Sequence, residues 1–159
     1  MRIVLFEPEI PPNTGNVARL CAATGTELHL VEPLGFKLEN RYLKRAGLDY
    51  WPHVRLFTWP CWHAFAKRPD RPAAERWIMT SAKVHHAPVP LQHFTFQPED
   101  CLIFGPETRG LPSEVLSASP YHIRIPMREG GVRSINLSTA AGIVLYAALA
   151  RTGLLDAWN

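Results

Sequence analysis

The first 31 residues contain two apolar runs separated by a segment with the composition of a helix. We predict strands over Arg2–Phe6 and Glu27–Val31, the second with alternating polar and apolar residues. Residues 16–23, followed by Gly25, are predicted to form a helix. A strand, a helix and a second strand at this spacing predict a βαβ unit, in which the two strands are parallel and the connection is right-handed. The chain is therefore expected to fold as an α/β protein.

Further apolar runs predict more strands and the helices between them. The additional strands are expected over residues 54–58, 76–80, 101–104 and 121–126. The additional helices are expected over residues 39–46, 61–67, 112–117 and 136–151. Residues 84–100 contain three prolines and are expected to be irregular. Because no repeat or linker divides the 159 residues, we predict one domain over residues 1–159, with a parallel sheet of five or six strands and helices on both faces.

The composition argues against several classes of protein. The longest apolar run, residues 140–150, contains Gly142 and is too short to span a bilayer. The N-terminal residues are typical of a buried strand and not of a secretory signal, so a cytoplasmic location is expected. Three distant cysteines are expected to be reduced thiols. The adjacent His85 and His86 would point to opposite faces of a strand, so no metal site is expected.

Polar residues gather in three separated blocks, each where an apolar run meets glycine, proline or asparagine. The blocks are residues 13–19, residues 102–107 and residues 123–138. Ligands of open α/β sheets bind beyond the carboxyl ends of the strands. Three such loops therefore predict one site assembled from distant parts of the chain, which favours an enzyme over a structural protein. The net charge of +3 permits a phosphate-rich partner without requiring one.

Ordinary structural explanations compete with this interpretation. Gly15 stands alone, without a Gly-x-Gly-x-x-Gly pattern or a Walker lysine, so a dinucleotide site is not indicated although Glu32 lies near the position of a ribose-binding acid. Arg19 could form a surface salt bridge. We expect it close to a helix N-terminus, however, where it is better placed to meet a phosphate or an oxyanion. Glu107 fits a solvated turn as well as it fits a binding site.

The last predicted helix, residues 136–151, has two unusual features. Ser134 or Asn136 could cap its N-terminus, but three such residues in five positions, with Ser138, exceed what one cap needs and indicate a ligand. The helix is also apolar on nearly all sides, which is typical of a helix buried against more than one surface. In a domain of this size, part of that surface is expected to belong to a second subunit.

The three blocks resemble, in order and spacing, the three motifs of the SPOUT superfamily of RNA methyltransferases, specifically the SpoU/TrmH-type 2′-O-methyltransferases. The resemblance spans nearly the whole chain. Residues 7–16 and 45–50 are similar to the signature of the TrmL (YibK-like) branch, which has no additional RNA-binding domain. That branch methylates the ribose of the wobble cytidine or uridine in leucine tRNA anticodons. The resemblance implies S-adenosylmethionine as cofactor, tRNA as substrate, a homodimer, and a C-terminal trefoil knot in which residues 130–138 are threaded through a loop.

The resemblance also implies roles for individual residues. Cofactor contacts are implied at Met79, Gly105, Ile125, Met127, Ser134 and Leu137. The implied catalytic residues are Arg19, as the main one, with Asn13, Glu107, Ser134 and Asn136. The candidates for RNA contact are Lys37, Arg41, Lys44, Arg45, Arg133 and Tyr146, the last of which could instead lie at the subunit interface.

Two questions stay open at this point. Accounts of the family assign proton abstraction to the arginine that matches Arg19, but a guanidinium does not readily lose its proton, which favours binding of a phosphate and of the emerging oxyanion. The target could also be another tRNA ribose or an rRNA ribose, or the chain could be an RNA-binding module without catalysis.

Overall fold

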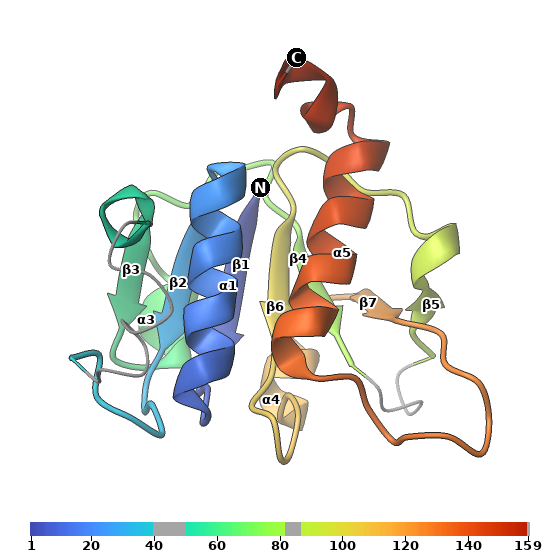
Figure 1. The fold of residues 1–159 in the computed structure, drawn as a ribbon, viewed down its shortest axis with the longest axis horizontal. Helices are drawn as coiled ribbons and strands as arrows, with labels where there is room; N and C mark the ends of the chain where they lie inside the picture. The colour runs from blue at the N-terminus through green and yellow to red at the C-terminus, as the bar shows by residue number, and fades with distance from the viewer. Residues whose placement is uncertain (40–49, 82–86, 159) are drawn as a thin grey trace.

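The computed structural model describes residues 1–39, 50–81 and 87–158. Within these residues one sheet contains seven strands in the order β3-β2-β1-β6-β4-β7-β5, and all neighbouring strands are parallel (Figure 1). The strands are β1 (Arg2–Phe6), β2 (Glu27–Val31), β3 (Leu56–Trp59), β4 (Trp77–Thr80), β5 (Val89–Pro90), β6 (Cys101–Phe104) and β7 (Tyr121–Arg124). The predicted α/β class with a parallel sheet is confirmed. The sheet has one strand more than predicted, because two residues of the segment expected to be irregular pair with β7 as β5.

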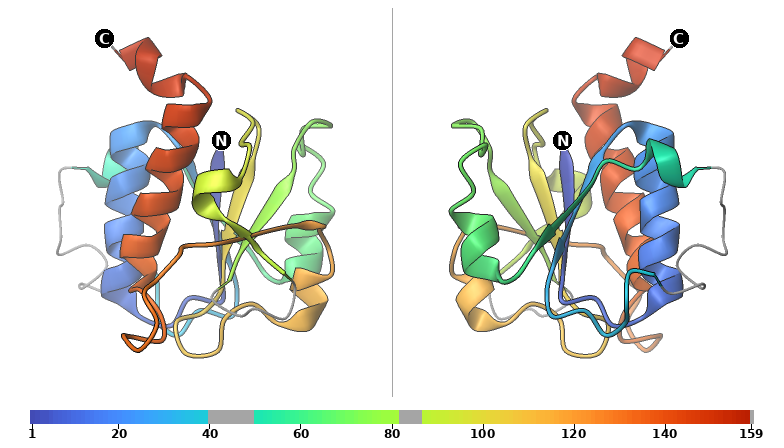
Figure 2. Two further views of the ribbon diagram at one scale, coloured as in Figure 1. Left: turned by 90° about the vertical axis from the view of Figure 1, so that its right-hand side faces the viewer. Right: turned by 90° about the vertical axis from the view of Figure 1, so that its left-hand side faces the viewer.

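Helices cover both faces of the sheet (Figure 2). Helices α1 (Pro11–Thr24) and α5 (Leu137–Arg151) pack side by side on one face, whereas α3 (Trp62–Ala66) and α4 (Ser113–Leu116) lie on the other. The short 3-10 helices are η1 (Trp51–His53), η3 (Leu91–His93) and η4 (Leu154–Trp158). Of the described helices, none combines the length and apolarity needed to cross a membrane. Residues 40–46 of the helix predicted over residues 39–46 lie outside the described residues, as do His85 and His86.

Helix α1 begins five residues before the predicted start at residue 16. Pro11 and Pro12 occupy its first positions, where a missing N–H costs nothing and the ring favours the helical φ angle. The helix ends as predicted at Gly25, whose φ of 65° is a conformation that favours glycine. The N–H of Gly25 donates to the carbonyl of Cys21 and closes the last turn.

The early start of α1 changes the position of two predicted site residues. Asn13 lies in the first turn of the helix and not in a loop, and Arg19 lies near the middle of the helix. The prediction that Arg19 sits at the positive end of the helix dipole is therefore wrong, because that field falls off within the first turn.

Strand β7 lies between β4 and β5, although both precede it in the chain. Thr80 of β4 and Val89 of β5 pair with Ile123 from opposite sides. The N–H of Ser81 also donates to the carbonyl of Ile123 at 3.1 Å. Strand β7 is therefore inserted between two strands that precede it in the chain. This is the trefoil-knot topology that the resemblance implies.

A buried salt bridge stabilises the opposite edge of the sheet, where the strands begin. The side chains of Arg68 and Glu75 are only 1% and 0% exposed, and Arg68 Nη2 donates to Glu75 Oε1 at 2.6 Å. Trp77 Nε1 donates to the same oxygen at 2.8 Å, and Arg2 Nη1 lies 3.4 Å from Glu75 Oε2. The carboxylate of Glu75 is thus paired on both oxygens, which ties the segment before β4 to β1 and to the end of α3.

His29 is a core residue, although the alternating pattern of β2 predicts a polar position. Its side chain is 1% exposed and stacks on Phe57, with ring centroids 4.8 Å apart. His29 Nδ1 accepts a hydrogen bond from Trp59 Nε1 at 3.0 Å. Burial, and next the charge of Arg68, lower the pKa of His29 to about 4. His29 is therefore neutral at neutral pH and packs with the aromatic residues around it.

Candidate active site

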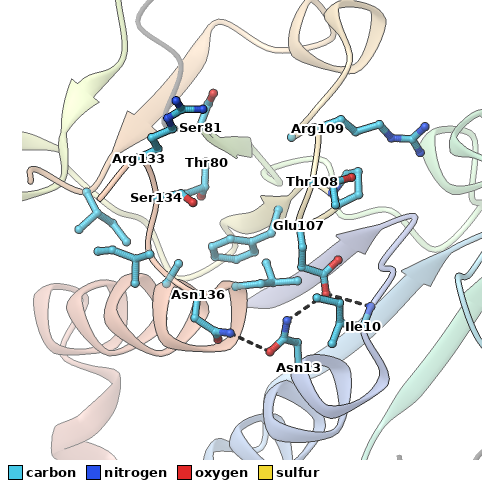
Figure 3. Close-up of a pocket in the computed structure, with 18 of the residues that line it drawn as sticks. Ile10, Asn13, Thr80, Ser81, Glu107, Thr108, Arg109, Arg133, Ser134 and Asn136 are labelled. Atoms are coloured by element: carbon cyan, nitrogen blue, oxygen red, sulfur yellow. Dashed lines mark hydrogen bonds between the residues drawn. The ribbon is translucent and has the colours of Figure 1, made fainter. Parts of the chain in front are cut away.

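The carboxyl ends of β6, β4 and β7 meet the N-terminal ends of α1 and α5 at one edge of the sheet, around a cavity of about 580 Å³ (Figure 3). Most of the predicted site residues line this cavity, namely Asn13, Gly105, Glu107, Ile125, Met127, Arg133, Ser134, Asn136 and Leu137. The expectation that the three blocks form one site is therefore confirmed as geometry. The role of each residue stays a prediction.

Three polar side chains from the three blocks form a continuous hydrogen-bonded chain (Figure 3). Asn136 Nδ2 donates to Asn13 Oδ1 at 2.9 Å, and Asn13 Nδ2 donates to Glu107 Oε1 at 3.1 Å. Each amide nitrogen donates to the next acceptor. The hydrogen bonds therefore determine which side of each asparagine amide carries the oxygen and which the nitrogen. This chain couples the first turn of α1, the start of α5 and the loop after β6.

Asn136 is also the N-cap of α5, which is one of the roles considered for it. Its Oδ1 accepts from the N–H of Ser138 at 2.9 Å and from the N–H of Thr139 at 3.4 Å. Ser138 Oγ donates to the same oxygen at 2.8 Å. Ser138 is thus part of the cap. The exposed Ser134 is not part of the cap and lines the cavity. Of the three polar residues that exceed the need of one cap, two form the cap of α5. Only Ser134 is left without a capping role.

Glu107 does not form a solvated turn. Its Oε2 accepts from the N–H of Glu9 at 2.9 Å, and its Oε1 accepts from the N–H of Ile10 at 3.1 Å as well as from Asn13. Ile10 is the N-cap residue of α1, and its own side chain provides no cap. A carboxylate in this position satisfies N–H groups at the start of α1 and complements the dipole of the helix.

Gly105 is required by the fold of its own loop. The N–H of Gly110 donates to the carbonyl of Pro106 at 3.0 Å, so the loop after β6 turns back on itself. A Cβ atom on Gly105 would lie 2.3 Å from the backbone nitrogen of Leu111 and 2.5 Å from the carbonyl carbon of Gly110. Gly105 is therefore needed where the polypeptide approaches itself closely, in addition to the cofactor contact that the resemblance implies.

Two of the predicted catalytic and cofactor residues do not line the cavity. The side chain of Met79 is fully buried in the core under α3 and α4, although its neighbour Thr80 lines the cavity. Arg19 is exposed on α1, where its guanidinium lies 5.7 Å from the centroid of the Tyr50 ring. Sequence reasoning missed Thr80 and Ser81, which lie at the end of β4 and directly after it and satisfy the same rule about the carboxyl ends of strands.

The candidates for RNA contact are dispersed. Lys37 is exposed in the segment after β2, Arg133 is exposed at the cavity, and Tyr146 is 45% exposed on α5. The remaining three candidates, Arg41, Lys44 and Arg45, lie outside the described residues.

A parallel sheet with a threaded C-terminal segment, and a cavity built from that segment and the carboxyl ends of the strands, defines a knotted α/β protein with a small-molecule site. The chain belongs to the SpoU rRNA Methylase family, which matches residues 1–146. The match includes all three blocks and the first ten residues of α5.

Individual relatives agree with this assignment. The chain is 47% identical over 156 residues to a tRNA (cytidine(34)-2′-O)-methyltransferase of Saccharophagus degradans, with 95% of each chain covered. It is 47% identical to a protein solved in work on 2′-OH methylation of C/U34 on tRNA, with a TM-score of 0.85 and 94% of each chain covered. An AdoMet-bound rRNA methyltransferase of Sinorhizobium meliloti has the same fold, with 23% identity, a TM-score of 0.81, and 94% of this chain and 55% of that chain covered.

Proposed function

We propose that this protein is an S-adenosylmethionine-dependent methyltransferase that modifies the 2′-oxygen of the ribose at position 34 of tRNA. The proposal is carried by one observation: Asn136, Asn13 and Glu107 link the three motifs of the family in a single hydrogen-bonded chain at one cavity. The names of the relatives support the reaction and the position of the nucleotide.

The cavity fits the cofactor. Its volume of about 580 Å³ falls within the range of roughly 300 to 1,000 Å³ that is typical of pockets for such ligands. Ile125, Met127 and Leu137 offer apolar surface for an adenine ring. The buried Thr80 Oγ1 has no hydrogen-bond partner among the described residues, and a polar group of a ligand would supply one. When bound, the cofactor supplies a methyl group on a sulfonium, which is an excellent leaving group.

Six residues are assigned to the cofactor, namely Met79, Gly105, Ile125, Met127, Ser134 and Leu137. Because the side chain of Met79 faces the opposite core, its contribution would come from its backbone. Gly105 contributes through the shape of its loop, and the other four side chains line the cavity.

Replacing Gly105 with alanine should weaken cofactor binding by about tenfold or more. The added Cβ collides with backbone atoms of Gly110 and Leu111, which cannot rotate away, and such overpacking costs about 1–3 kcal/mol. Isothermal titration with S-adenosylmethionine measures the affinity. Gly142→Ala is the matched control, because nothing lies within 4 Å of the position that its Cβ would take on α5, and alanine there is expected to add stability. Equal affinities for both variants would contradict this role of the loop.

Catalysis requires alignment of the ribose 2′-oxygen with the methyl carbon and stabilisation of its alkoxide character. We assign to Arg19 the binding of the adjacent phosphate and of the emerging oxyanion, with solvent or phosphate as the proton acceptor. Asn13, Glu107 and Asn136 hold the loops around the reacting ribose, and Ser134 lies where it can contact both substrates.

We further propose a homodimer that packs through the outer faces of α1 and α5. Four exposed positions on α5 recur at one face and are uncharged, namely Thr139, Ile143, Tyr146 and Ala150, whereas the exposed Arg151 at the end of the helix donates to the carbonyl of Leu91. Ile143 and Tyr146 are 39% and 45% exposed, and Arg19 is exposed on the neighbouring helix α1. A twofold interface uses the same patch on both subunits. Such an interface would bring Arg19 of one subunit toward the cavity of the other subunit. In its own chain Arg19 does not line the cavity.

Introducing a charge at the centre of this face should dissociate the dimer. We expect Tyr146→Lys to be monomeric in size-exclusion chromatography with light scattering, because an unpaired charge buried in an interface is strongly unfavourable. Val132→Lys, at a position that is 72% exposed outside the two helices, should remain dimeric. A wild-type protein that is monomeric would contradict the dimer directly.

The reaction is tested by methyl transfer from labelled S-adenosylmethionine to total tRNA, with the labelled nucleotide located by nuclease mapping. Label on the ribose of nucleotide 34 in leucine tRNAs is expected, and it would agree with a cytoplasmic protein acting on cytoplasmic tRNA. Label at another tRNA position would retain the chemistry and change the target. No label on tRNA, despite binding of the cofactor, would overturn tRNA as the substrate.

A further inference from the structure

We propose that Arg109 binds a phosphate of the RNA at the mouth of the cavity. This assignment rests on the proposed function. It concerns a residue to which the family motifs assign no role. Arg109 lines the cavity, pairs with Glu7, and has a side chain that is 59% exposed. Arg133 lines the cavity on the opposite side (Figure 3). Two guanidinium groups therefore flank the opening through which a ribose must enter.

The loop that carries Arg109 is fixed to the segment before α1. Three consecutive residues of the loop make contacts with it: Glu107 accepts from the N–H of Glu9, Thr108 donates to Glu9, and Arg109 pairs with Glu7. The Thr108 N–H and Oγ1 lie 3.1 Å and 2.9 Å from the two oxygens of Glu9. A guanidinium held in this way loses less conformational entropy when it binds an anion than one on a flexible side chain.

Glu7 itself adopts a conformation that is uncommon outside glycine. Its φ is 47°, in the left-handed region. The Glu7 carboxylate nevertheless stays against Arg109, so the surrounding contacts hold both partners in place. Because more than half of the Arg109 side chain is exposed, a phosphate can reach the outer side of its guanidinium while Glu7 keeps the inner side.

The strand order places a further basic residue, Lys37, at the same edge of the sheet as Arg109. At the carboxyl edge of the sheet the ends of β6, β1 and β2 are consecutive. The segment after β2 packs on the segment after β1, because the N–H of Gly35 donates to the carbonyl of Pro8 at 2.9 Å. A Cβ atom on Gly35 would lie 2.7 Å from the carbonyl oxygen of Glu9. Lys37 follows in this segment, so Arg109 and Lys37 come from loops at the same edge of the sheet, and we expect a nucleic-acid backbone that enters the cavity to contact both.

A carboxylate of the cofactor is the other anion that Arg109 could bind. The position of Arg109 argues against it, because the side chain runs outward from the rim, away from Ser134 and from the first turn of α5 (Figure 3). It also already holds one carboxylate, that of Glu7. A phosphate diester at the rim can approach the exposed side of the Arg109 side chain without entering the cavity.

The test compares Arg109→Gln with Arg55→Gln. Arg55 is a close match, because its side chain is also 59% exposed and also pairs with a carboxylate, that of Glu27, but at the opposite edge of the sheet. Binding of a leucine tRNA transcript is measured by fluorescence anisotropy between about 50 and 300 mM NaCl, where phosphate contacts dominate the salt dependence. Affinity for S-adenosylmethionine is measured in parallel, and circular dichroism establishes that each variant is folded.

We expect Arg109→Gln to weaken tRNA binding by about tenfold and to reduce the slope of log affinity against log salt by about one, because one phosphate contact is lost. Arg109→Lys should retain the slope and lose part of the affinity, since a point charge replaces a fork of donors. Arg55→Gln should match the wild type in both quantities. Cofactor affinity should be unchanged in all three variants.

Different results overturn different statements. If Arg109→Gln and the wild type bind tRNA with the same affinity and slope, the assignment of Arg109 is wrong and the proposed function stands. If Arg109→Gln loses affinity for S-adenosylmethionine instead, Arg109 belongs to the cofactor site. If the wild type binds the cofactor but neither binds nor methylates tRNA, the proposed function fails, and the assignment of Arg109 fails with it.

Discussion

Replacing Arg19 with alanine should reduce methyl transfer to tRNA by at least about 100-fold, which is the usual cost of removing one donor to a developing oxyanion. Binding of S-adenosylmethionine should stay near the wild-type affinity, because Arg19 is exposed on α1 and does not line the cavity. Single-turnover methyl transfer and isothermal titration measure the two quantities separately. A loss of cofactor affinity would show that the assignment of Arg19 to the RNA is wrong.

A subunit-mixing experiment determines in which chain Arg19 acts. Arg19→Ala and Asn136→Ala are each expected to be inactive alone. If Arg19 acts across the interface, a mixed dimer contains one cavity with an intact Asn136 and an intact Arg19 from the other subunit, and activity returns. If Arg19 acts in its own chain, every site in the mixed dimer carries one lesion and the mixture stays inactive. Activity in the mixture therefore requires a dimer whose active site combines Asn136 of one subunit with Arg19 of the other.

The largest loss of stability is expected for Glu75→Gln, at about 3–5 kcal/mol in the free energy of unfolding, because it leaves a buried charge without its partner. Arg68 is 1% exposed and pairs with Glu75, which also accepts from Trp77 Nε1. For a domain of this size the change corresponds to a decrease of about 10 °C in the melting temperature. Chemical denaturation followed by circular dichroism measures the free energy, and calorimetry measures the temperature.

Asp70→Asn is the control for this prediction. Asp70 Oδ1 lies 3.9 Å from Arg68 Nε, but the side chain is 64% exposed, and an ion pair in water contributes less than about 1 kcal/mol. A second variant separates charge from packing: the double replacement Arg68→Met and Glu75→Leu removes both charges and should recover much of the stability. Equal losses in Glu75→Gln and Asp70→Asn would show that burial does not determine the contribution of this pair.

Apolar runs and cap residues in the sequence predicted most of the strands and the start of the last helix. The six strands predicted from apolar runs are all present, and α5 begins next to Asn136, where the cap residues indicate a helix start. Helix α1 begins before the predicted residue 16 because Pro11 and Pro12 occupy its first turn, where proline is favoured although it ends helices elsewhere. Strand β5 was missed because its two residues depend on β7, which lies more than 30 positions later in the chain.

The candidate site shows the same division. The residues around the cavity were predicted from the rule that ligands bind beyond the carboxyl ends of parallel strands, together with the motifs. Met79 and Arg19 come from the same motifs and do not line the cavity, because the direction of a side chain depends on the register of β4 and on the true start of α1. Arg109 was not selected, since nothing in a turn of four polar or small residues distinguishes it before Glu7 is placed beside it.

The sequence by itself determined the α/β class, the parallel order within the first βαβ unit and the three blocks that hold the polar groups, because strand periodicity, helix ends and turn residues act over a few positions. Only the tertiary structure decided that β7 lies between β4 and β5, that Asn136 bonds to Asn13, and that Glu107 satisfies the start of α1. These hydrogen bonds join residues about 100 positions apart, and they form only when the fold brings both partners together. A local pattern carries no information about which distant partner will complete such a pair.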